Sequence, residues 1–166
     1  RITEPSFRVD WYFTPSRGAL ESARVEELAE PLPTDEAYPT IDGSLADFVD
    51  RYLSAPEPIL VLQGPPGTGK TRLIRAILGE LSRRNGESAQ VIYTGDRFAL
   101  ENDEIYVRFI TGTDDAFVVE DADHLLTPRA DGNEHLHRFL SVSDGLVRIP
   151  SRKVMFSTNL PNIGDL

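Results

Sequence analysis

Apolar and polar residues follow two patterns along the chain from about residue 44 onward. Short, mostly apolar runs are typical of strands that are buried on both faces of a parallel sheet. They cover residues 59–63, 90–94, 116–120 and 153–157. Elsewhere apolar residues recur at helical spacing, in 45–53, 69–85 and 133–142. Strands that alternate with helices predict an α/β fold with a parallel, doubly wound sheet flanked by helices.

Local signals mark the ends of two of these helices. Ser44 is a good N-cap for the first helix, and Pro56 stops it. The second helix begins near Gly69 and ends at Asn85-Gly86, a pair suited to a helix C-terminus. We expect its apolar face to be buried against the sheet. That face consists of Ile74, Ile77, Leu78 and Leu81.

The beginning of the chain has a different composition. Seven of the 12 prolines lie in residues 1–58. Residues 9–13 alternate as in a half-buried strand, 19–29 are expected to form a short helix, and 30–36 read as an extended acidic linker. We therefore expect residues 1–37 to be a leader or the end of another domain.

Composition narrows the possible functions. The 166 residues include no cysteine, which excludes disulfides, thiolate zinc sites and thiol catalysis. No apolar run is long enough to cross a membrane, so we expect a cytoplasmic protein without a membrane partner. The net charge of -10 argues against broad nucleic-acid binding. Residues 59–100 are nevertheless basic, with six basic and three acidic residues, which favours a bound polyanion or a chance cluster of arginines.

A phosphate-binding loop follows the first apolar run. Residues 64–71 match G-x-x-x-x-G-K-[ST], in which backbone N–H groups and the start of a helix surround an anion. Lys70 can reach the β- and γ-phosphates, and Thr71 can offer its hydroxyl to Mg²⁺. We include Arg72 among the expected nucleotide contacts. The whole set is Gly64, Pro65, Pro66, Gly67, Thr68, Gly69, Lys70, Thr71 and Arg72.

Polar residues end two further strands. Glu120 and Asp121 follow an apolar run, and a phosphate-binding loop needs an acid in that place to organise a metal ion. Asn159 follows residues 154–158 and can bind a phosphate oxygen or a nucleophilic water without adding charge. The alternatives are a strand that ends in an acidic loop and an ordinary turn asparagine.

The chain resembles the AAA ATPases at these three places. Residues 64–71, 117–123 and 156–161 are similar to the Walker A, Walker B and sensor 1 motifs of that family. The intervening stretches 131–133 and 143–146 also resemble it. In motif style the chain is closest to the AAA ATPases that assemble the respiratory-chain Rieske complex. The resemblance covers about residues 38–166, and it implies that they form one AAA-type nucleotide-binding core.

This resemblance implies ATP and Mg²⁺ as cofactors, ATP hydrolysis to ADP, and a homo-oligomeric ring, a hexamer, that remodels a protein client. In the family an arginine finger, a helical lid and a last strand follow sensor 1, so we expect them to be absent from this chain, which ends at Leu166. Residues 38–43 either contact adenine, with Ile41 packed on the base, or form a plain turn. An aromatic pore-loop triplet is not evident in residues 95–115, so threading of a polypeptide is not expected.

The order of the two acids departs from the family, which has Asp before Glu. By position Glu120 joins Thr71 in binding the metal, and Asp121 orients the water with help from Asn159 and Lys70. The competing assignment makes Asp121 the metal acid. Because Asp121 is one methylene shorter than the usual glutamate, the alternative function is a nucleotide-gated interaction module with little or no turnover. A P-loop kinase fits less well, because a sensor-type asparagine suits an ATPase.

Overall fold

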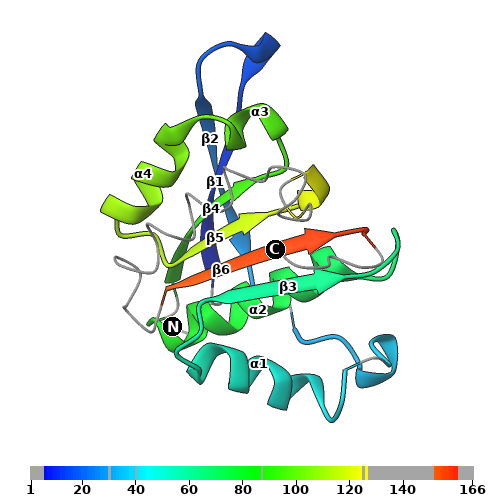
Figure 1. Cartoon of the computed structure of the whole chain (residues 1–166). Coiled ribbons are helices and arrows are strands. Elements are labelled where there is room, and N and C mark those ends of the chain that lie inside the picture. Colours follow the sequence, from blue (N-terminus) through cyan, green and yellow to red (C-terminus); the bar gives the residue numbers. More distant parts are fainter. Residues whose placement is uncertain are drawn as a thin grey trace.

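The computed structural model describes residues 6–29, 31–39, 41–86, 88–124, 126 and 152–160. In these residues six strands form one sheet, in the spatial order β2-β1-β4-β5-β6-β3 (Figure 1). Their bounds are β1 (Ser6–Phe13), β2 (Glu21–Leu28), β3 (Ile59–Gln63), β4 (Ser88–Thr94), β5 (Ala116–Val119) and β6 (Lys153–Thr158). Every neighbouring pair is parallel except the antiparallel hairpin of β1 and β2.

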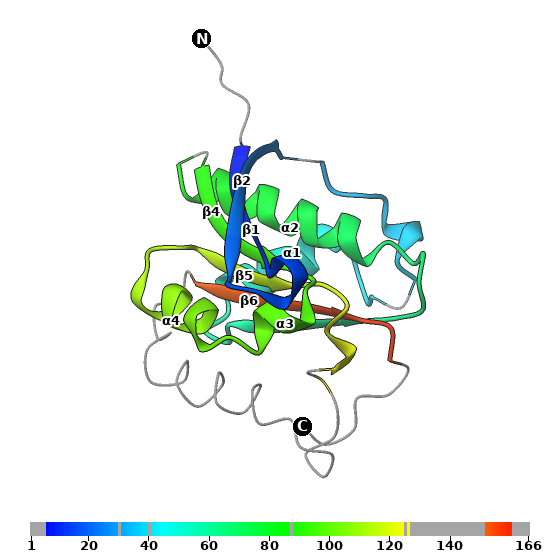
Figure 2. The ribbon, with the colours of Figure 1, turned by 90° about the horizontal axis from the view of Figure 1, so that it is seen from above.

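Helices cover both faces of this sheet. The longer pair, α1 (Leu45–Ser54) and α2 (Lys70–Arg84), lies on one face, and α3 (Arg97–Leu100) and α4 (Asp103–Thr111) lie on the other (Figure 2). Three short 3-10 turns, η1 (Pro15–Arg17), η2 (Asp35–Ala37) and η3 (Ala122–His124), connect the elements. The predicted α/β fold, with a mostly parallel sheet between two helical layers, is confirmed.

The alternation of side chains along each strand divides the core into two layers. On β4, Val91 and Tyr93 pack with α1 and α2, whereas Ile92 packs with α3 and α4. Met155 and Phe156 of β6 divide in the same way. Since the central strands are buried on both faces, they read as continuous apolar runs in the sequence.

Most element predictions for residues 44–120 are confirmed. The Ser44 hydroxyl accepts a hydrogen bond from the Asp47 N–H at 3.1 Å and caps α1. Helix α2 begins after Gly69 and has Asn85 as its C-cap, as expected. All four residues of its predicted apolar face are buried. The strands at 59–63, 90–94, 116–120 and 153–157 are found within one or two residues of their predicted bounds.

One segment differs from its prediction, and a second had no predicted element. The expected helix at 19–29 is instead strand β2, because pairing with β1 along eight residues outweighs the helix preference of its Glu, Ala and Leu residues. The connection 95–115 contains α3 and α4, whose starts are capped by the side chains of Asp96 and Asn102. Asp and Asn are residue types that commonly cap the start of a helix, and they were the sequence signal for these two starts.

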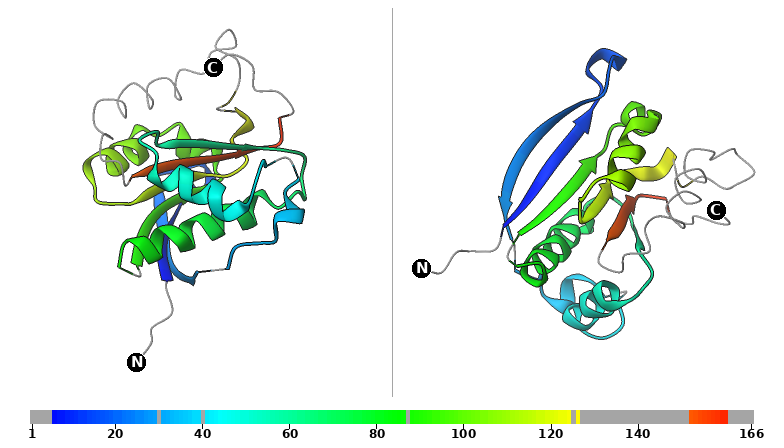
Figure 3. Two further views of the ribbon diagram at one scale, coloured as in Figure 1. Left: turned by 90° about the horizontal axis from the view of Figure 1, so that it is seen from below. Right: turned by 90° about the vertical axis from the view of Figure 1, so that its left-hand side faces the viewer.

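The N-terminal hairpin extends the sheet beyond β4. Val9 is paired with Val91, and Trp11 with Tyr93, in parallel register. The tip of the hairpin projects past the neighbouring strands (Figure 3). The domain boundary expected after residue 37 stays a prediction, but strands on its two sides share one sheet.

Several predicted features lie outside the described residues. These are the helix at 133–142 and the family-like stretches at 131–133 and 143–146. Among the helices that are described, none combines the length and the apolar character needed to cross a membrane.

Candidate functional site

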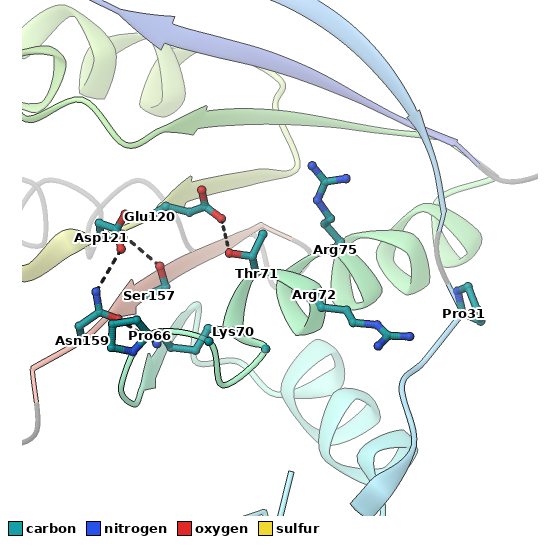
Figure 4. A pocket seen from close by; sticks show the side chains of 12 residues that line it. Pro31, Pro66, Lys70, Thr71, Arg72, Arg75, Glu120, Asp121, Ser157 and Asn159 are labelled. Carbon is teal, nitrogen blue, oxygen red and sulfur yellow. Dashed lines mark hydrogen bonds between the residues drawn. The ribbon is translucent and has the colours of Figure 1, made fainter. Parts of the chain in front are cut away.

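The carboxyl ends of β3, β5 and β6 meet at one edge of the sheet. These three strands are parallel, so the residues that follow them lie side by side. A pocket of about 990 Å³ opens at this edge between the loop after β3 and the ends of β5 and β6 (Figure 4). Its walls include Lys70, Thr71, Glu120, Asp121 and Asn159, which the sequence had singled out separately.

The loop between β3 and α2 depends on glycine at two places. Gly67 and Gly69 have φ angles of +80° and +87°, which residues with a Cβ rarely adopt. A Cβ on Gly69 would also lie 2.8 Å from the Tyr38 hydroxyl oxygen. That hydroxyl donates a hydrogen bond to the Gly69 carbonyl at 2.7 Å. The loop therefore packs directly against the segment before α1.

The ammonium of Lys70 lies inside the loop. Its Nζ donates to the carbonyl oxygens of Gly64 at 2.6 Å and Pro65 at 2.9 Å. It also donates to Asn159 Oδ1 at 3.0 Å, which joins the loop to the end of β6. These acceptors, and the Thr68 hydroxyl oxygen at 3.5 Å, are all neutral, so the oxygens of an anion can replace them at the lysine.

Thr71 and Glu120 form the second link across the pocket. The Thr71 hydroxyl donates to Glu120 Oε1 at 2.7 Å (Figure 4). A hydroxyl and a carboxylate are hard oxygen donors, which Mg²⁺ prefers, and Mg²⁺ is usually held by one or two such groups and by phosphate. The donor set at this point therefore fits a magnesium ion.

The buried ring of Tyr93 on β4 lies near Glu120. Burial raises the pKa of Tyr93, and the nearby carboxylate of Glu120 raises it further, so the phenol stays protonated.

Asp121 points to different partners. Its backbone N–H donates to Ser157 Oγ at 3.1 Å, and its Oδ1 accepts from Asn159 Nδ2 at 3.5 Å. Its φ angle of +51° is unusual for a residue other than glycine, and such backbone strain recurs at functional sites. As expected of adjacent residues, Glu120 and Asp121 do not share partners.

Asp123 fixes the asparagine in place. Its Oδ1 accepts from the Thr158 hydroxyl at 2.5 Å and from the Asn159 N–H at 2.9 Å. The sequence analysis gave Asp123 no role, although it lies only two residues beyond the acid pair. Its function depends on the pairing of β5 with β6, which the sequence does not contain.

A second, more apolar cavity of about 560 Å³ lies beside the loop. Tyr38, Ile41, Phe48 and Leu73 line it together with residues 62–65, 67 and 68. Ile41 is therefore next to the loop. Of the two alternatives given for residues 38–43, contact of Ile41 with a base or a plain turn, the base contact stays a prediction. A flat apolar group bound here would stand beside an anion in the loop.

Other lining residues were missed by the sequence analysis. Pro31, Arg75 and Ser157 line the larger pocket, and Arg72 lines it as expected (Figure 4). Arg75 Nη1 lies 3.0 Å from Glu27 Oε2, so an acid of β2 reaches the side of this pocket. The basic character of residues 59–100 was the sequence signal for Arg75.

The family model described as "ATPase family associated with various cellular activities (AAA)" matches residues 60–162. The chain belongs to the AAA ATPase family. The match includes the phosphate-binding loop, both acids and Asn159. Ile41 and the N-terminal hairpin lie outside it. Membership of the AAA family is thus confirmed, whereas special similarity to the Rieske-assembly ATPases stays a prediction.

Solved AAA structures are among the structural neighbours. A structure reported for katanin self-assembly is 22% identical, with a TM-score of 0.46; the match covers 78% of this chain and 49% of that one. The FIGL-1 AAA domain is 20% identical, with a TM-score of 0.42, over 69% of this chain and 43% of that chain. The chain thus spans about half the length of these structures. No curated protein matches its sequence.

Proposed function

We propose that this AAA chain binds ATP with Mg²⁺ and hydrolyses it to ADP and phosphate. The observation that carries the proposal is the pair of links across one pocket, Thr71 to Glu120 and Lys70 to Asn159. They bring together the groups that phosphoryl transfer needs, a phosphate-binding loop, a metal-binding acid and a polar residue for the nucleophile.

The two cavities suggest how the nucleotide is held. The phosphates would lie on the loop, with backbone N–H groups and the start of α2 around them and Lys70 as a point charge. The base would enter the apolar cavity and pack on Ile41. Arg72, which lines the larger pocket, would lie on the phosphate side.

Thr71 and Glu120 are the residues that would hold the magnesium ion. When bound, the ion neutralises charge that develops on the phosphate oxygens. Glu120 suits this role because its carboxylate already accepts a hydrogen bond from Thr71. This contact supports Glu120, rather than Asp121, as the metal acid.

Asp121 and Asn159 would position the nucleophile. Asp121 is exposed at the pocket, and its carboxylate contacts the Asn159 amide. A water held by these two groups would attack the γ-phosphorus in line with the departing ADP. Lys70 and the loop N–H groups would stabilise the charge on the transferring group.

A ring would complete the site. We propose a homo-oligomer, a hexamer as in the resemblance, in which a neighbouring subunit supplies an arginine and the assembly remodels a protein client in the cytoplasm. An arginine supplied in trans contributes about 10³–10⁵ to the rate of related hydrolases. The turnover of each subunit should therefore rise steeply with protein concentration.

One observation favours the alternative, a nucleotide-gated interaction module with little turnover. Asp121 has its side chain bonded to Asn159 and its backbone in the left-handed region. A shorter acid in this setting reaches less far toward a γ-phosphate than the glutamate usual in the family. The module would bind nucleotide as tightly as the ATPase but release almost no phosphate.

Two measurements separate these functions. Calorimetry should show ATP binding that strengthens with Mg²⁺, and Glu120→Gln should remove most of that strengthening. Phosphate release, followed over a hundredfold range of protein concentration, should rise per subunit for the ATPase. Mg²⁺-dependent nucleotide binding without phosphate release at any protein concentration would support the interaction module. If the protein bound no nucleotide, both proposed functions would be contradicted.

A further inference from the structure

The turn after β5 is joined by hydrogen bonds to the end of β6. The Asp121 N–H donates to Ser157 Oγ at 3.1 Å, and Asn159 Nδ2 donates to Asp121 Oδ1 at 3.5 Å (Figure 4). Two residues further on, Asp123 Oδ1 accepts from the Thr158 hydroxyl at 2.5 Å and from the Asn159 N–H at 2.9 Å. These four hydrogen bonds connect both acids of the turn with three successive residues at the end of the strand.

The same end of β6 is also bound to the phosphate-binding loop. The Thr158 carbonyl accepts from the Gly64 N–H at 3.2 Å, and Asn159 Oδ1 accepts from Lys70 Nζ at 3.0 Å. The Asn159 amide therefore lies between Lys70 on one side and Asp121 on the other. A shift of this strand end would change both of these contacts together.

Asp123 is the acceptor that holds this strand end in place. Thr158 is fully buried, with 0% of its surface exposed, so water cannot easily replace the acceptor of its hydroxyl. The Thr158 Oγ1 atom in turn accepts from the Leu160 N–H at 3.1 Å, which makes the hydroxyl part of the backbone turn after the strand. Loss of the Asp123 oxygen would leave a buried hydroxyl and the Asn159 N–H without this acceptor, which favours a shift of the strand end.

We propose that Asp123 is a positioning residue for Asn159, and that its accepting oxygen, rather than its charge, sets where the asparagine amide lies. This inference rests on the proposed function, because it assigns the nucleophilic water to Asp121 and Asn159. A displacement of about 1 Å in a positioning group can lower a rate by about 100-fold. Loss of the Asp123 oxygen should therefore lower turnover more than it lowers affinity for Mg-ATP.

The first test compares two substitutions of Asp123 in the full chain. Asp123→Asn keeps an oxygen that can accept both hydrogen bonds and removes the charge, whereas Asp123→Ala removes the oxygen as well. At saturating Mg-ATP we expect Asp123→Ala to lower phosphate release by about 10- to 100-fold, and Asp123→Asn to restore most of that loss. Affinity for Mg-ATP, measured by calorimetry, should change much less than turnover in both variants.

The matched control is Asp115→Ala, at the opposite end of β5. Asp115 also accepts two hydrogen bonds, from the Gln90 N–H at 2.9 Å and from Asn85 Nδ2 at 3.1 Å. Like Asp123 it is half-buried. Its loss should lower the melting temperature, as the loss of Asp123 does, but should leave the turnover of the folded protein unchanged. The control thus separates a general loss of stability from a change at the site.

A second readout does not depend on hydrolysis. Hydrogen exchange of the Asn159 backbone N–H is followed by NMR in the nucleotide-free protein. We expect exchange to accelerate by about tenfold or more in Asp123→Ala, because this N–H loses its acceptor. It should stay close to wild type in Asp123→Asn and in Asp115→Ala. If wild type bound nucleotide but released no phosphate, the proposed hydrolysis would fail while the exchange measurement still tested the position of Asn159.

Several results would overturn the inference. With an active wild type, these are unchanged turnover in Asp123→Ala, an equal loss in Asp123→Asn, and an equal loss in Asp115→Ala. Parallel losses of affinity and turnover would also contradict it, because a positioning residue for the nucleophile acts on turnover first. Unchanged exchange at Asn159 in Asp123→Ala would overturn it whether or not the protein hydrolyses ATP.

Discussion

Two lysines at opposite ends of the sheet show how differently one residue type can be used. Lys70, at the carboxyl ends of the strands, is partly exposed and bound to two carbonyls of its own loop and to Asn159. Lys153, at the amino end of β6, has 0% of its surface exposed. Its Nζ donates to the carbonyls of Ala55 and Glu57, just past the end of α1.

The difference lies in what can replace the partners of each ammonium. The acceptors of Lys70 border an open pocket, so an incoming anion can take their place. Those of Lys153 are part-buried carbonyls just beyond a helix C-terminus, and the Tyr52 ring lies 4.9 Å from the ammonium. Burial accordingly lowers the pKa of Lys153. Substitutions at the carboxyl edge should change chemistry, and substitutions at the amino edge should change stability.

The largest effect is expected from Asp121→Asn. The amide keeps the shape of the side chain and removes the charge that polarises the nucleophilic water, so hydrolysis should fall by about 10²–10⁴. Affinity for Mg-ATP and the melting temperature should remain close to wild type. Phosphate release with parallel calorimetry measures both quantities.

One outcome would contradict the assignment of Asp121 to the nucleophilic water. If Asp121→Asn lost its Mg²⁺ dependence first, Asp121 would be the metal acid and the roles of the two acids would be exchanged. Restoring the usual order, with Glu120→Asp and Asp121→Glu together, is the matched control. It should keep or raise the turnover.

The next effect is that of Lys70→Ala on nucleotide affinity. Removal of one partner from a charged, hydrogen-bonded pair costs about 2–4 kcal/mol, which is a loss of about 30- to 1,000-fold in affinity. The fold should remain intact, because the hydrogen bonds of the lysine to the described residues go to its own loop and to Asn159. Calorimetry measures the loss of nucleotide affinity, and the melting temperature shows whether the fold is intact. Unchanged affinity would contradict the site assignment.

The parts of this site that could be predicted are those that follow one another in the chain. The loop, the acid pair and Asn159 each come directly after an apolar run, and parallel strands bring such ends together. Residues 64–71 even contain their own helix start. Likewise α1 and α2 are specified by their caps and by one continuous apolar face.

What could not be predicted depends on pairing between distant segments. Trp11 meets Tyr93, and Glu27 meets Arg75, only because β1 lies beside β4 and β2 beside β1. The composition of β2 favours a helix, and only its partner makes it a strand. The hydrogen bonds of Lys153 to the carbonyls after α1 could not be predicted for the same reason. A lysine at the start of a strand is normally expected to be exposed to solvent.

Lys153→Met should be the clearest change at the amino edge. Methionine keeps an unbranched chain in the same space, but the carbonyls of Ala55 and Glu57 lose their donor. We expect the free energy of unfolding to fall by about 2–3 kcal/mol, measured by urea denaturation. Nucleotide affinity of the folded protein should not change. An unchanged midpoint would show that the aliphatic chain alone supports this end of the sheet.

The smallest effect is expected from Arg152→Leu, on the other face of the same strand end. Neighbouring residues of an extended chain point to opposite faces, so Arg152 reaches α4 while Lys153 reaches α1. Its guanidinium donates to the carbonyls of Asp114 and Phe109 and lies 4.1 Å from the centre of the Phe109 ring.

Leucine would still cover part of that ring, and Asp114 lies only half-buried near solvent that can take over the lost hydrogen bond. We therefore expect a loss of about 1–2 kcal/mol in the free energy of unfolding, with nucleotide affinity and turnover unchanged. The midpoints of urea denaturation of the two variants show which of the two side chains contributes more to stability. A larger loss of stability for Arg152→Leu than for Lys153→Met would contradict this ranking. A change in nucleotide affinity in either variant would contradict the view that the amino edge of the sheet affects stability alone.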